Sequence, residues 1–435
     1  MDLADTVRMG LRGLPRTKDR WKTAILVVAM SASAIDQAMA AVDVPANDPN
    51  IQYFGRFDMA DALKPRCDWP GSAIQARFTG TSITVKISGG QNDFNVIIDG
   101  QWKSKLTVDG KTVQVAASGL AEGTHTLLLA KRTEGFQGIS TFAGFQLEDG
   151  KALVAPPARP ARKILFIGDS YTVGYGDEAN TLTCSDRRPF DNNYVAYGPV
   201  TARAVDAEYS VQAVSGYGML HNYGDTNPQS SQPMPSVFDR TLFSAASPKW
   251  DMSKWIPDLI VIALGSNDFS TAVKPSEAQY AAAYADFLGK IRGWFPNAQI
   301  LCMTYSVDNL QKKYVDSVVA RATAKGDAKI HRVHMPALPT SDLGCDYHPN
   351  VAGQQKYSDA LLPSVKQYLG VTSSIAPQRY NRKGAAATQR SGSAVTFRIP
   401  MRGIAGPMNA SEHPDWVDAR GRFLPLRHFP GSTGH

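Results

Sequence analysis

The sequence predicts an α/β domain built on a five-stranded parallel sheet and preceded by an all-β sandwich. Residues 51–148 contain short segments of alternating apolar residues without a helical pattern, whereas residues 161–370 alternate continuous apolar runs with helical patterns. Alternation is typical of strands with one buried face, and continuous apolar runs are typical of parallel strands buried on both faces. A proline-rich linker at 155–160 separates the two parts.

The first part, taken as residues 41–154, is expected to form the sandwich. Its strand-like segments include AIQARF, SITVKIS, DFNVIID, KTVQVAA and THTLLLAK. Asp99-Gly100 and Asp109-Gly110 are dipeptides that favour hairpin turns. Several short strands at this spacing indicate two packed antiparallel sheets.

The second part, residues 161–370, is expected to be a sheet covered by helices on both faces. Its five apolar runs lie at 163–168, 208–215, 258–265, 298–306 and 329–335. Helical patterns are clearest at 277–294 and 309–325, and a last helix is expected from near Pro349 to about Tyr368, with the proline in its first turn. Strands that alternate with helices indicate an α/β/α architecture.

Both ends of the chain differ from the body. Four basic residues between Arg16 and Lys22 precede an apolar run at 23–34, and Ala38-Met39-Ala40 follows as a small-residue cleavage site. This pattern predicts a signal peptide over 1–40 and a secreted or periplasmic protein. The run is short of the roughly twenty residues that span a bilayer, although an uncleaved anchor remains the alternative. The segment 371–435, rich in Arg, Gly, Ser and Pro, is expected to be a disordered basic tail.

The net charge of +7 lies at these two ends. Residues 1–40 carry +2 and residues 371–435 carry +6, which leaves −1 for residues 41–370. A nucleic-acid-binding protein concentrates basic residues on its folded body. The body of this chain has no such surplus, so we expect no nucleic-acid partner.

Polar residues follow the ends of the predicted parallel strands. Gly168-Asp169-Ser170, Ser215-Gly216 and Gly265-Ser266-Asn267-Asp268 follow the first three strands, and Asp346-Tyr347-His348-Pro349 precedes the last helix. Ligands of such sheets bind outside the carboxyl ends of the strands. These segments are therefore expected to meet in one active site.

The residue types in these segments suit acyl transfer. Ser170 is the predicted nucleophile, His348 its base, and Asp346 a group that could hold the imidazole in one tautomer. The backbone N–H groups of Ser170 and Gly216, with the side-chain amide of Asn267, are the predicted oxyanion donors. The chain has no Gly-x-Ser-x-Gly motif, so the pattern typical of α/β-hydrolases does not apply.

Together, these four segments resemble the conserved blocks of the SGNH/GDSL hydrolase superfamily. The runs at 250–270 and 344–350, with the preceding β domain, are similar to carbohydrate esterase family 2 of the acetyl xylan esterase type. Members join a jelly-roll module to an SGNH domain and remove O-acetyl groups from plant polysaccharides. The resemblance implies the roles given above for Ser170, His348, Gly216 and Asn267. It leaves open whether Asp346 or a backbone carbonyl orients the histidine.

The same resemblance makes three aromatic residues, Tyr217, Trp255 and Tyr347, candidates for contact with sugar rings, with packing roles as the alternative. The expected function is deacetylation of an acetylated polysaccharide or oligosaccharide. A generic GDSL lipase or lysophospholipase and a carbohydrate-binding protein with a degenerate hydrolase domain are the alternatives. The β domain favours carbohydrate by family analogy.

The remaining candidates, for a disulfide or a metal site, are cysteines and histidines. Cys184 and Cys345 lie in predicted loops near the site, where a disulfide and two free thiols are equally compatible with the sequence, and Cys302 lies in an apolar run. No cofactor is expected. No metal site is expected either, because the spacing of His331 and His334 matches no zinc pattern.

Overall fold

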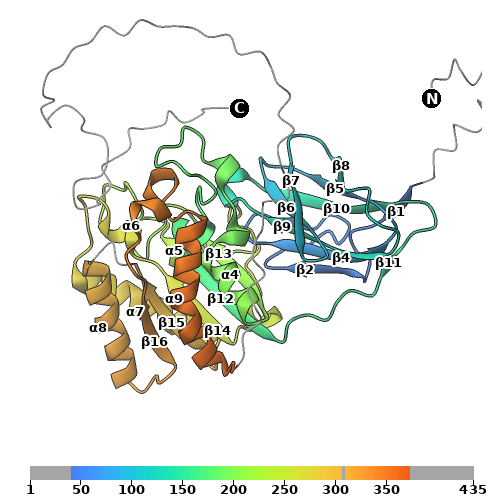
Figure 1. The fold of residues 1–435 in the computed structure, drawn as a ribbon. Helices are drawn as coiled ribbons and strands as arrows, with labels where there is room; N and C mark the ends of the chain where they lie inside the picture. The colour runs from blue at the N-terminus through green and yellow to red at the C-terminus, as the bar shows by residue number, and fades with distance from the viewer. Residues whose placement is uncertain (1–40, 306–308, 373–435) are drawn as a thin grey trace, which may run out of the picture.

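The computed structural model describes residues 41–305 and 309–372 as two packed domains (Figure 1). The predicted signal peptide and nearly all of the predicted tail lie outside these residues. Among the described helices, none is long and apolar enough to cross a membrane.

The sandwich domain contains two antiparallel sheets, which confirms the predicted all-β region. One sheet has the strand order β1 (Val42–Val44), β10 (Ser140–Leu147), β5 (Ile83–Ser88) and β8 (Val113–Ala117), with β3 (Arg66–Cys67) also paired to β10. The other has the order β11 (Leu153–Val154), β4 (Ala73–Thr79), β9 (Thr124–Lys131), β6 (Asp93–Ile98) and β7 (Gln101–Thr107), with β2 (Ile51–Phe54) beside β4. Buried side chains from both sheets, among them Phe78, Val85, Phe94, Leu129 and Phe145, form the core.

The two Asp-Gly dipeptides have different structures. Asp99-Gly100 forms a two-residue hairpin between β6 and β7, and both residues have positive φ, as a type I′ turn requires. Asp109-Gly110 connects β7 to β8, which belong to different sheets. The second dipeptide therefore turns the chain between the sheets and does not form a hairpin.

The α/β domain has the predicted five-stranded parallel sheet, with the strand order β13 (Ala207–Ala213), β12 (Arg162–Gly168), β14 (Leu259–Ala263), β15 (Gln299–Thr304) and β16 (Ile330–His334). Helices α4 (Tyr197–Ala204) and α9 (Val351–Leu369) pack in one core, and α7 (Glu277–Trp294) and α8 (Asn309–Ala324) in another. The short helices are α3 (Ser170–Val173), α5 (Met234–Val237) and α6 (Ser266–Phe269). All five residues of β14 are buried because helices cover both faces of the sheet (Figure 1).

The last helix begins slightly later than predicted. Asn350 caps it, since its side-chain oxygen accepts hydrogen bonds from the backbone N–H groups of Ala352 and Gly353. Pro349 therefore precedes the cap and does not lie in the first turn.

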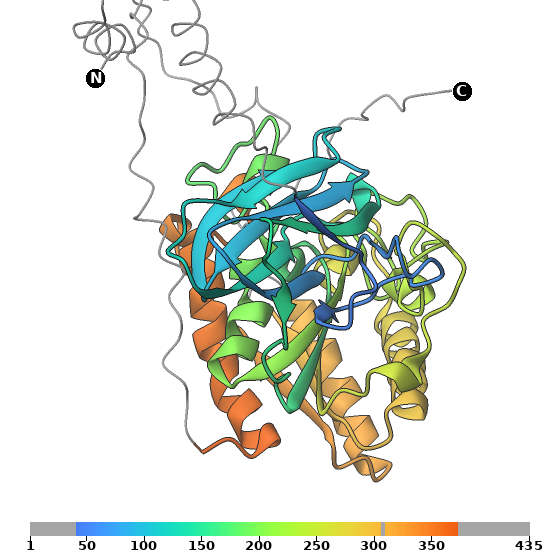
Figure 2. The ribbon, with the colours of Figure 1, turned by 90° about the vertical axis from the view of Figure 1, so that its right-hand side faces the viewer.

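The two domains share a packed interface (Figure 2). All six residues of β6 are buried, because its sheet faces the sandwich core on one side and the α/β domain on the other. Ile97 of β6 packs with Tyr194 and Val195 of the α/β domain. Trp69 of the sandwich domain is fully buried and donates a hydrogen bond to the carbonyl oxygen of Thr241 at 3.1 Å. These contacts fix the sandwich domain against the α/β domain.

Candidate active site

The polar segments meet where the strand order of the parallel sheet reverses. β12 lies between β13 and β14, and these three strands are followed by Ser170, Gly216 and Asn267, respectively. The carboxyl ends of parallel strands at such a switch point border a crevice. The sheet topology therefore places these three residues beside one another.

The turn that carries Ser170 is fixed by its neighbours. A Cβ atom at Gly168 would lie 2.0 Å from Oγ1 of Thr172, so only glycine allows this turn. Asp169 caps α3 by accepting a hydrogen bond from the N–H of Tyr171 at 3.1 Å, and it accepts another from the Ser266 hydroxyl at 2.5 Å. Burial raises the pKa of Asp169 to about 7. This carboxyl group thus ties the turn of the nucleophile to the loop of Asn267.

Ser170 and His348 form a hydrogen-bonded pair. Nε2 of the histidine lies 2.7 Å from Oγ of the serine, and both side chains are buried. The distance lies within the range required of a nucleophile and its general base. Helix α9 begins three residues after His348, and Asn350 holds the preceding loop through bonds to the carbonyl oxygens of Ser341 and Leu343.

The other nitrogen of His348 faces main-chain oxygen atoms. Nδ1 lies 3.0 Å from the carbonyl oxygen of Asp346 and 3.2 Å from that of Cys345. The Asp346 carboxylate instead accepts a hydrogen bond from the Tyr175 hydroxyl at 2.6 Å. Of the two possibilities that the sequence left open, the structure has the backbone carbonyl. The expectation for the Asp346 side chain is corrected accordingly.

Loop geometry accounts for this arrangement. Asp346 and Tyr347 have φ values of 51° and 61°, in the left-handed region that residues other than glycine seldom adopt. The loop is closed by a bond from the N–H of Gly344 to the carbonyl oxygen of His348 at 2.7 Å. A short closed loop of this kind directs its carbonyl groups inward, towards the imidazole that follows.

The surroundings of His348 keep its imidazole neutral. Burial lowers its pKa to about 4, the positive charge of Arg187 acts in the same direction, and the carbonyl acceptors oppose both. Tyr175 stacks on the imidazole with ring centroids 4.2 Å apart, and Tyr171 contacts it edge-on at 5.0 Å. A neutral, oriented imidazole can accept the proton of Ser170.

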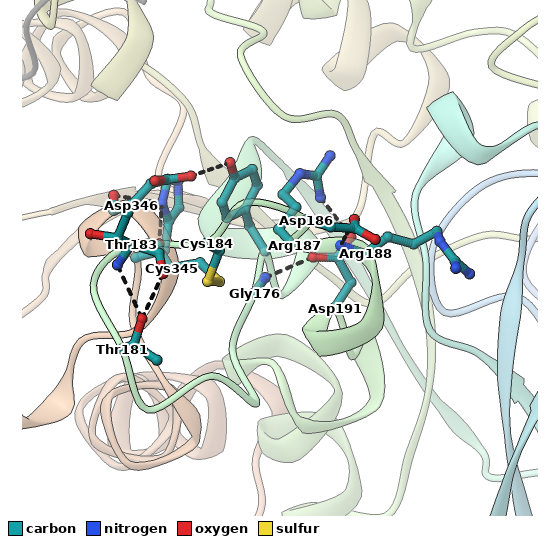
Figure 3. The surroundings of a disulfide bond; sticks show 12 residues. Gly176, Thr181, Thr183, Cys184, Asp186, Arg187, Arg188, Asp191, Cys345 and Asp346 are labelled. Atoms are coloured by element: carbon teal, nitrogen blue, oxygen red, sulfur yellow. Dashed lines mark hydrogen bonds and ion pairs between the residues drawn. A yellow bond between two sulfur atoms is a disulfide. The ribbon is translucent and has the colours of Figure 1, made fainter. Parts of the chain in front are cut away.

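A disulfide between Cys184 and Cys345 joins this loop to the segment after α3 (Figure 3). The two Cα atoms lie 5.4 Å apart, within the usual range for a disulfide. Beside it, Asp191 accepts a hydrogen bond from the N–H of Gly176 at 2.7 Å. The disulfide anchors Cys345, the residue next to Asp346, so it restrains the loop that orients the base. Cys302 and Cys67 are buried free thiols.

The predicted oxyanion donors lie in two connected loops. Gly216 has a φ of 79° and is the third residue of a turn closed by a bond from the N–H of Tyr217 to the carbonyl oxygen of Val214. The Asn267 side-chain amide donates to the carbonyl oxygen of Tyr217 at 2.9 Å and carries a second N–H. Asp268 connects the loops further by accepting three backbone hydrogen bonds, from Met219, Leu220 and His221.

The comparisons with known proteins agree with this architecture. The family model "Carbohydrate esterase 2 N-terminal" matches residues 53–157, and "GDSL-like Lipase/Acylhydrolase family" matches residues 166–356. An acetylxylan esterase / glucomannan deacetylase of Cellvibrio japonicus is 33% identical over 342 residues, which cover 76% of this chain and 89% of that protein. The chain belongs to carbohydrate esterase family 2.

Further relatives of this family 2 esterase include a longer protein and a solved structure. Cellulase/esterase CelE of Acetivibrio thermocellus is 38% identical over 335 residues, which cover 74% of this chain but only 40% of that protein. A family two carbohydrate esterase from Clostridium thermocellum, solved in complex with cellohexaose, has 35% identity and a TM-score of 0.70. That match covers 74% of this chain and 99% of the solved one.

The three aromatic candidates lie in different places. Tyr217 follows Gly216, and Tyr347 precedes His348, so both flank the site. Trp255 does not, because its indole N–H donates to Glu208 at 2.6 Å, and Glu208 lies beside Lys163 at the amino end of the sheet. The seven-residue strand β12 separates that end from the turn of Ser170 by about 20 Å. The expectation of Trp255 as an active-site residue is therefore wrong.

The sequence analysis missed a contribution from the sandwich domain. Phe136, in the short 3-10 helix Gly135–Gln137, is 55% exposed, and its ring lies 6.2 Å from that of Tyr217 and 5.3 Å from that of Phe243. No motif marks this residue. An exposed aromatic residue between predicted strands could have been noted, but its position beside Tyr217 depends on domain packing.

The two histidines considered above for a metal site have ordinary polar partners. His331 lies 2.9 Å from Oε1 of Gln299 and stacks on Tyr368, and His334 contacts Thr304 and Asp316. Over 41–305 and 309–372, no group of three or more His, Cys, Asp or Glu side chains is arranged to hold a metal ion.

Proposed function

We propose that this protein is a serine esterase that removes O-acetyl groups from plant-type polysaccharides or oligosaccharides. The observation that carries the proposal is the 2.7 Å contact between Ser170 and His348 at the switch point of the sheet. Membership of family 2 supports ester hydrolysis. The printed activities of its relatives, acetylxylan esterase and glucomannan deacetylase, support an acetylated plant glycan as substrate.

The geometry supports an acyl-enzyme mechanism. Oγ of Ser170 attacks the acetyl carbonyl carbon while Nε2 of His348 takes the hydroxyl proton. The resulting oxyanion accepts hydrogen bonds from the N–H groups of Ser170 and Gly216 and from the Asn267 amide. Collapse breaks the ester bond, and the imidazolium returns its proton to the sugar oxygen that leaves. Water, deprotonated by His348, then attacks the acyl-enzyme. The bond to Oγ of Ser170 breaks as the imidazolium returns its proton to that oxygen, and acetate is released.

The main-chain carbonyl of Asp346 takes the place of the acidic member of a triad. It accepts the N–H of Nδ1 and so directs the lone pair of Nε2 towards Ser170. Tyr175 restrains the ring from one face. In this proposal Asp346 acts through its backbone, and its carboxylate positions Tyr175.

A short acyl group fits the burial of the site. The side chains of Ser170, Asn267 and His348 are each less than 10% exposed. A longer acyl chain would gain about 0.8 kcal/mol for each CH₂ group only where an apolar groove receives it. This favours acetyl esters over the long-chain esters that a lipase hydrolyses.

We expect the wall formed by Phe136 and Tyr217 to contact the sugar. Exposed aromatic rings offer a flat apolar surface that suits the C–H face of a pyranose. The related esterase solved with cellohexaose binds a β-glucan oligosaccharide. A glycan backbone lying across this wall would present a pendant acetyl group to Ser170.

An acyl-length series tests the proposed function. For p-nitrophenyl esters, kcat/KM is expected to fall at least about tenfold from acetate to butyrate, which equals about 1.4 kcal/mol. Release of acetate from acetylated xylan and glucomannan should accompany it. A profile that rises from acetate through butyrate to octanoate would favour the lipase alternative instead.

We also propose that the protein is exported. The basic and apolar pattern of 16–34 and the site at Ala38-Met39-Ala40 support it, as does the disulfide, which is stable in oxidising compartments. N-terminal sequencing of the extracellular or periplasmic protein tests this, with a mature chain expected to begin near residue 41. A full-length chain found only with membranes would favour the anchor.

A further inference from the structure

One loop of the sandwich domain reaches the active site. It follows β9, and its residue Glu134 is fully buried. The loop is held from within by Lys131, whose ammonium group donates to the carbonyl oxygens of Thr133 and Glu134 at 2.5 and 3.2 Å. A buried carboxylate is costly unless it is paired and hydrogen-bonded, so its partners are informative.

The first partner belongs to the predicted oxyanion turn. Oε2 of Glu134 accepts a hydrogen bond from the N–H of Ser215 at 2.8 Å. Ser215 and Gly216 are the two central residues of the turn from Val214 to Tyr217. A turn with positive φ at its third residue is of type II, in which the central peptide has one defined orientation. The N–H of Gly216 belongs to that central peptide, so the bond to Ser215 helps to fix its direction.

The second partner of Glu134 is Arg187, which contacts the ring that stacks on the base. Oε1 of Glu134 accepts a close hydrogen bond from the guanidinium of Arg187, which also pairs with Asp191 at 2.5 Å. The guanidinium lies 4.1 Å from the centroid of the Tyr175 ring, and the imidazole of His348 lies 4.2 Å from the same centroid. Both groups are thus in contact with the Tyr175 ring. Arg187 therefore supports the ring on which His348 stacks.

We propose that Glu134 is a positioning residue through which the sandwich domain sets the geometry of both the oxyanion turn and the base. This inference rests on the proposed esterase function. One carboxylate oxygen fixes the turn of Gly216, and the other fixes the Arg187–Tyr175 stack behind His348. The sandwich domain therefore contributes a positioning residue to the active site.

A matched control lies at the other end of the same interface. Glu208 is also a buried carboxylate paired with an arginine, since Arg159 of the linker donates to both of its oxygen atoms at 2.9 Å. Arg159 also donates to the carbonyl oxygen of Tyr53 in the sandwich domain. Glu208 thus joins the domains as Glu134 does, but at the amino end of β13, away from Ser170.

The test compares Glu134→Gln with Glu208→Gln in the full chain, using p-nitrophenyl acetate well below the melting temperature of each variant. Glu134→Gln keeps the shape of the side chain but replaces one acceptor oxygen with an NH₂ group. That group then faces an N–H donor of Ser215 or Arg187. The kcat of this variant is expected to fall at least about tenfold with KM changed less than twofold, because the loss of one oxyanion donor alone costs about 10²–10³. Glu208→Gln should keep kcat within twofold, whatever its loss in melting temperature.

A second readout separates positioning from loss of folded protein. A small phosphonofluoridate labels Ser170 through a tetrahedral adduct that needs the oxyanion donors and the base. Its second-order rate constant should fall in parallel with kcat in Glu134→Gln. If that variant does not fold, Arg187→Gln, which leaves the bond to Ser215 in place, is expected to lower kcat at least about fivefold.

The outcomes are distinguishable. If the wild type is active and the kcat of Glu134→Gln lies within threefold of it, the inference is overturned. Equal losses of kcat in Glu134→Gln and Glu208→Gln, at an equal fraction of folded protein, overturn it as well. If Glu134→Gln does not fold, an Arg187→Gln variant with the wild-type kcat overturns the inference. A wild type that neither hydrolyses acetate esters nor reacts with the phosphonofluoridate overturns the proposed function, and the inference with it.

Discussion

The carboxyl and amino ends of the parallel sheet differ in both shape and chemistry. At the carboxyl end, Ser170, Asn267 and His348 are nearly closed off from solvent, and a hydrogen bond joins Ser170 to His348. At the amino end, an open cleft of about 890 Å³ lies between the domains, with Trp250 and Trp255 in its wall. The residues that line this cleft do not include the nucleophile, the base or the oxyanion donors.

The difference follows from topology and pairing. Loops after parallel strands all emerge at the carboxyl end, where their backbone groups can be directed at a ligand. In the cleft, by contrast, the buried carboxylate of Glu208 is already paired, because it accepts hydrogen bonds from both Arg159 and the Trp255 indole. The presence of a large cleft is thus a poor guide to catalysis in this protein. Convergence of donors around a nucleophile is a better one.

The largest expected effect breaks the chemistry of the carboxyl end. Ser170→Ala removes the nucleophile and should lower kcat for p-nitrophenyl acetate by at least about 10³-fold. The small side chain fits the buried site, so the melting temperature should change little. A folded Ser170→Ala variant with more than about a tenth of the wild-type kcat would contradict the proposed mechanism.

The pH dependence of kcat/KM tests whether the buried base stays neutral. Because burial lowers the pKa of His348 to about 4, the base stays neutral well below the usual histidine range. We expect kcat/KM at pH 5.5 to remain above about half of its value at pH 7.5, whereas an unshifted imidazole would retain about a tenth. The charge of Arg187 acts on the imidazole, and the Asp346 carboxylate is bonded to the Tyr175 ring that stacks on it.

Folding must be followed in the same experiment. The unfolded chain protonates this histidine near pH 6.5, and the folded chain only near pH 4. Unfolding therefore takes up a proton between these values, and stability falls as the pH is lowered through this window. Circular dichroism at each pH separates this loss from inactivation. An acid limb centred at pH 6–7 in fully folded protein would show that the imidazole is not held neutral.

A smaller effect is expected for the Asp346 side chain. Asp346→Asn retains the backbone carbonyl that faces Nδ1, and asparagine tolerates the left-handed conformation. Its kcat should fall less than about fivefold, whereas His348→Ala should lose at least about 10³-fold. Steady-state rates with acetate esters compare the two. Equal losses would mean that the carboxylate, and not the carbonyl, orients the imidazole.

Much of the fold followed from sequence because the signals were local. Continuous apolar runs placed the five parallel strands, and the segments that follow them placed Ser170, Gly216 and Asn267. The failures arose where local pattern gives no information. Which oxygen of Asp346 faces the histidine depends on loop closure and two left-handed residues. Trp255 misled because it precedes β14, and so lies at the amino end.

The contribution of the sandwich domain was also beyond the reach of sequence patterns. Glu134 and Phe136 belong to a loop after a strand that had been predicted correctly, yet nothing in their spacing indicates the α/β domain. Their roles depend on how β6 and β9 pack against that domain. Contacts between domains join residues far apart in sequence, and no periodicity reports them.

The last prediction opposes two aromatic residues, one from each end of the sheet. Phe136→Ala removes an exposed ring beside Tyr217 and should raise KM for acetylated xylan about three- to tenfold, as expected for the loss of about 1 kcal/mol of contact. It should leave kcat/KM for p-nitrophenyl acetate within twofold, because that substrate has no sugar. Trp255→Ala should change neither value by more than twofold, since its ring lies at the amino end and contacts Glu208. The two truncations remove aromatic surface at opposite ends of the parallel sheet, so each controls for the other. A rise in KM for the polymer with Trp255→Ala alone would move the glycan to the open cleft and away from the wall beside Ser170.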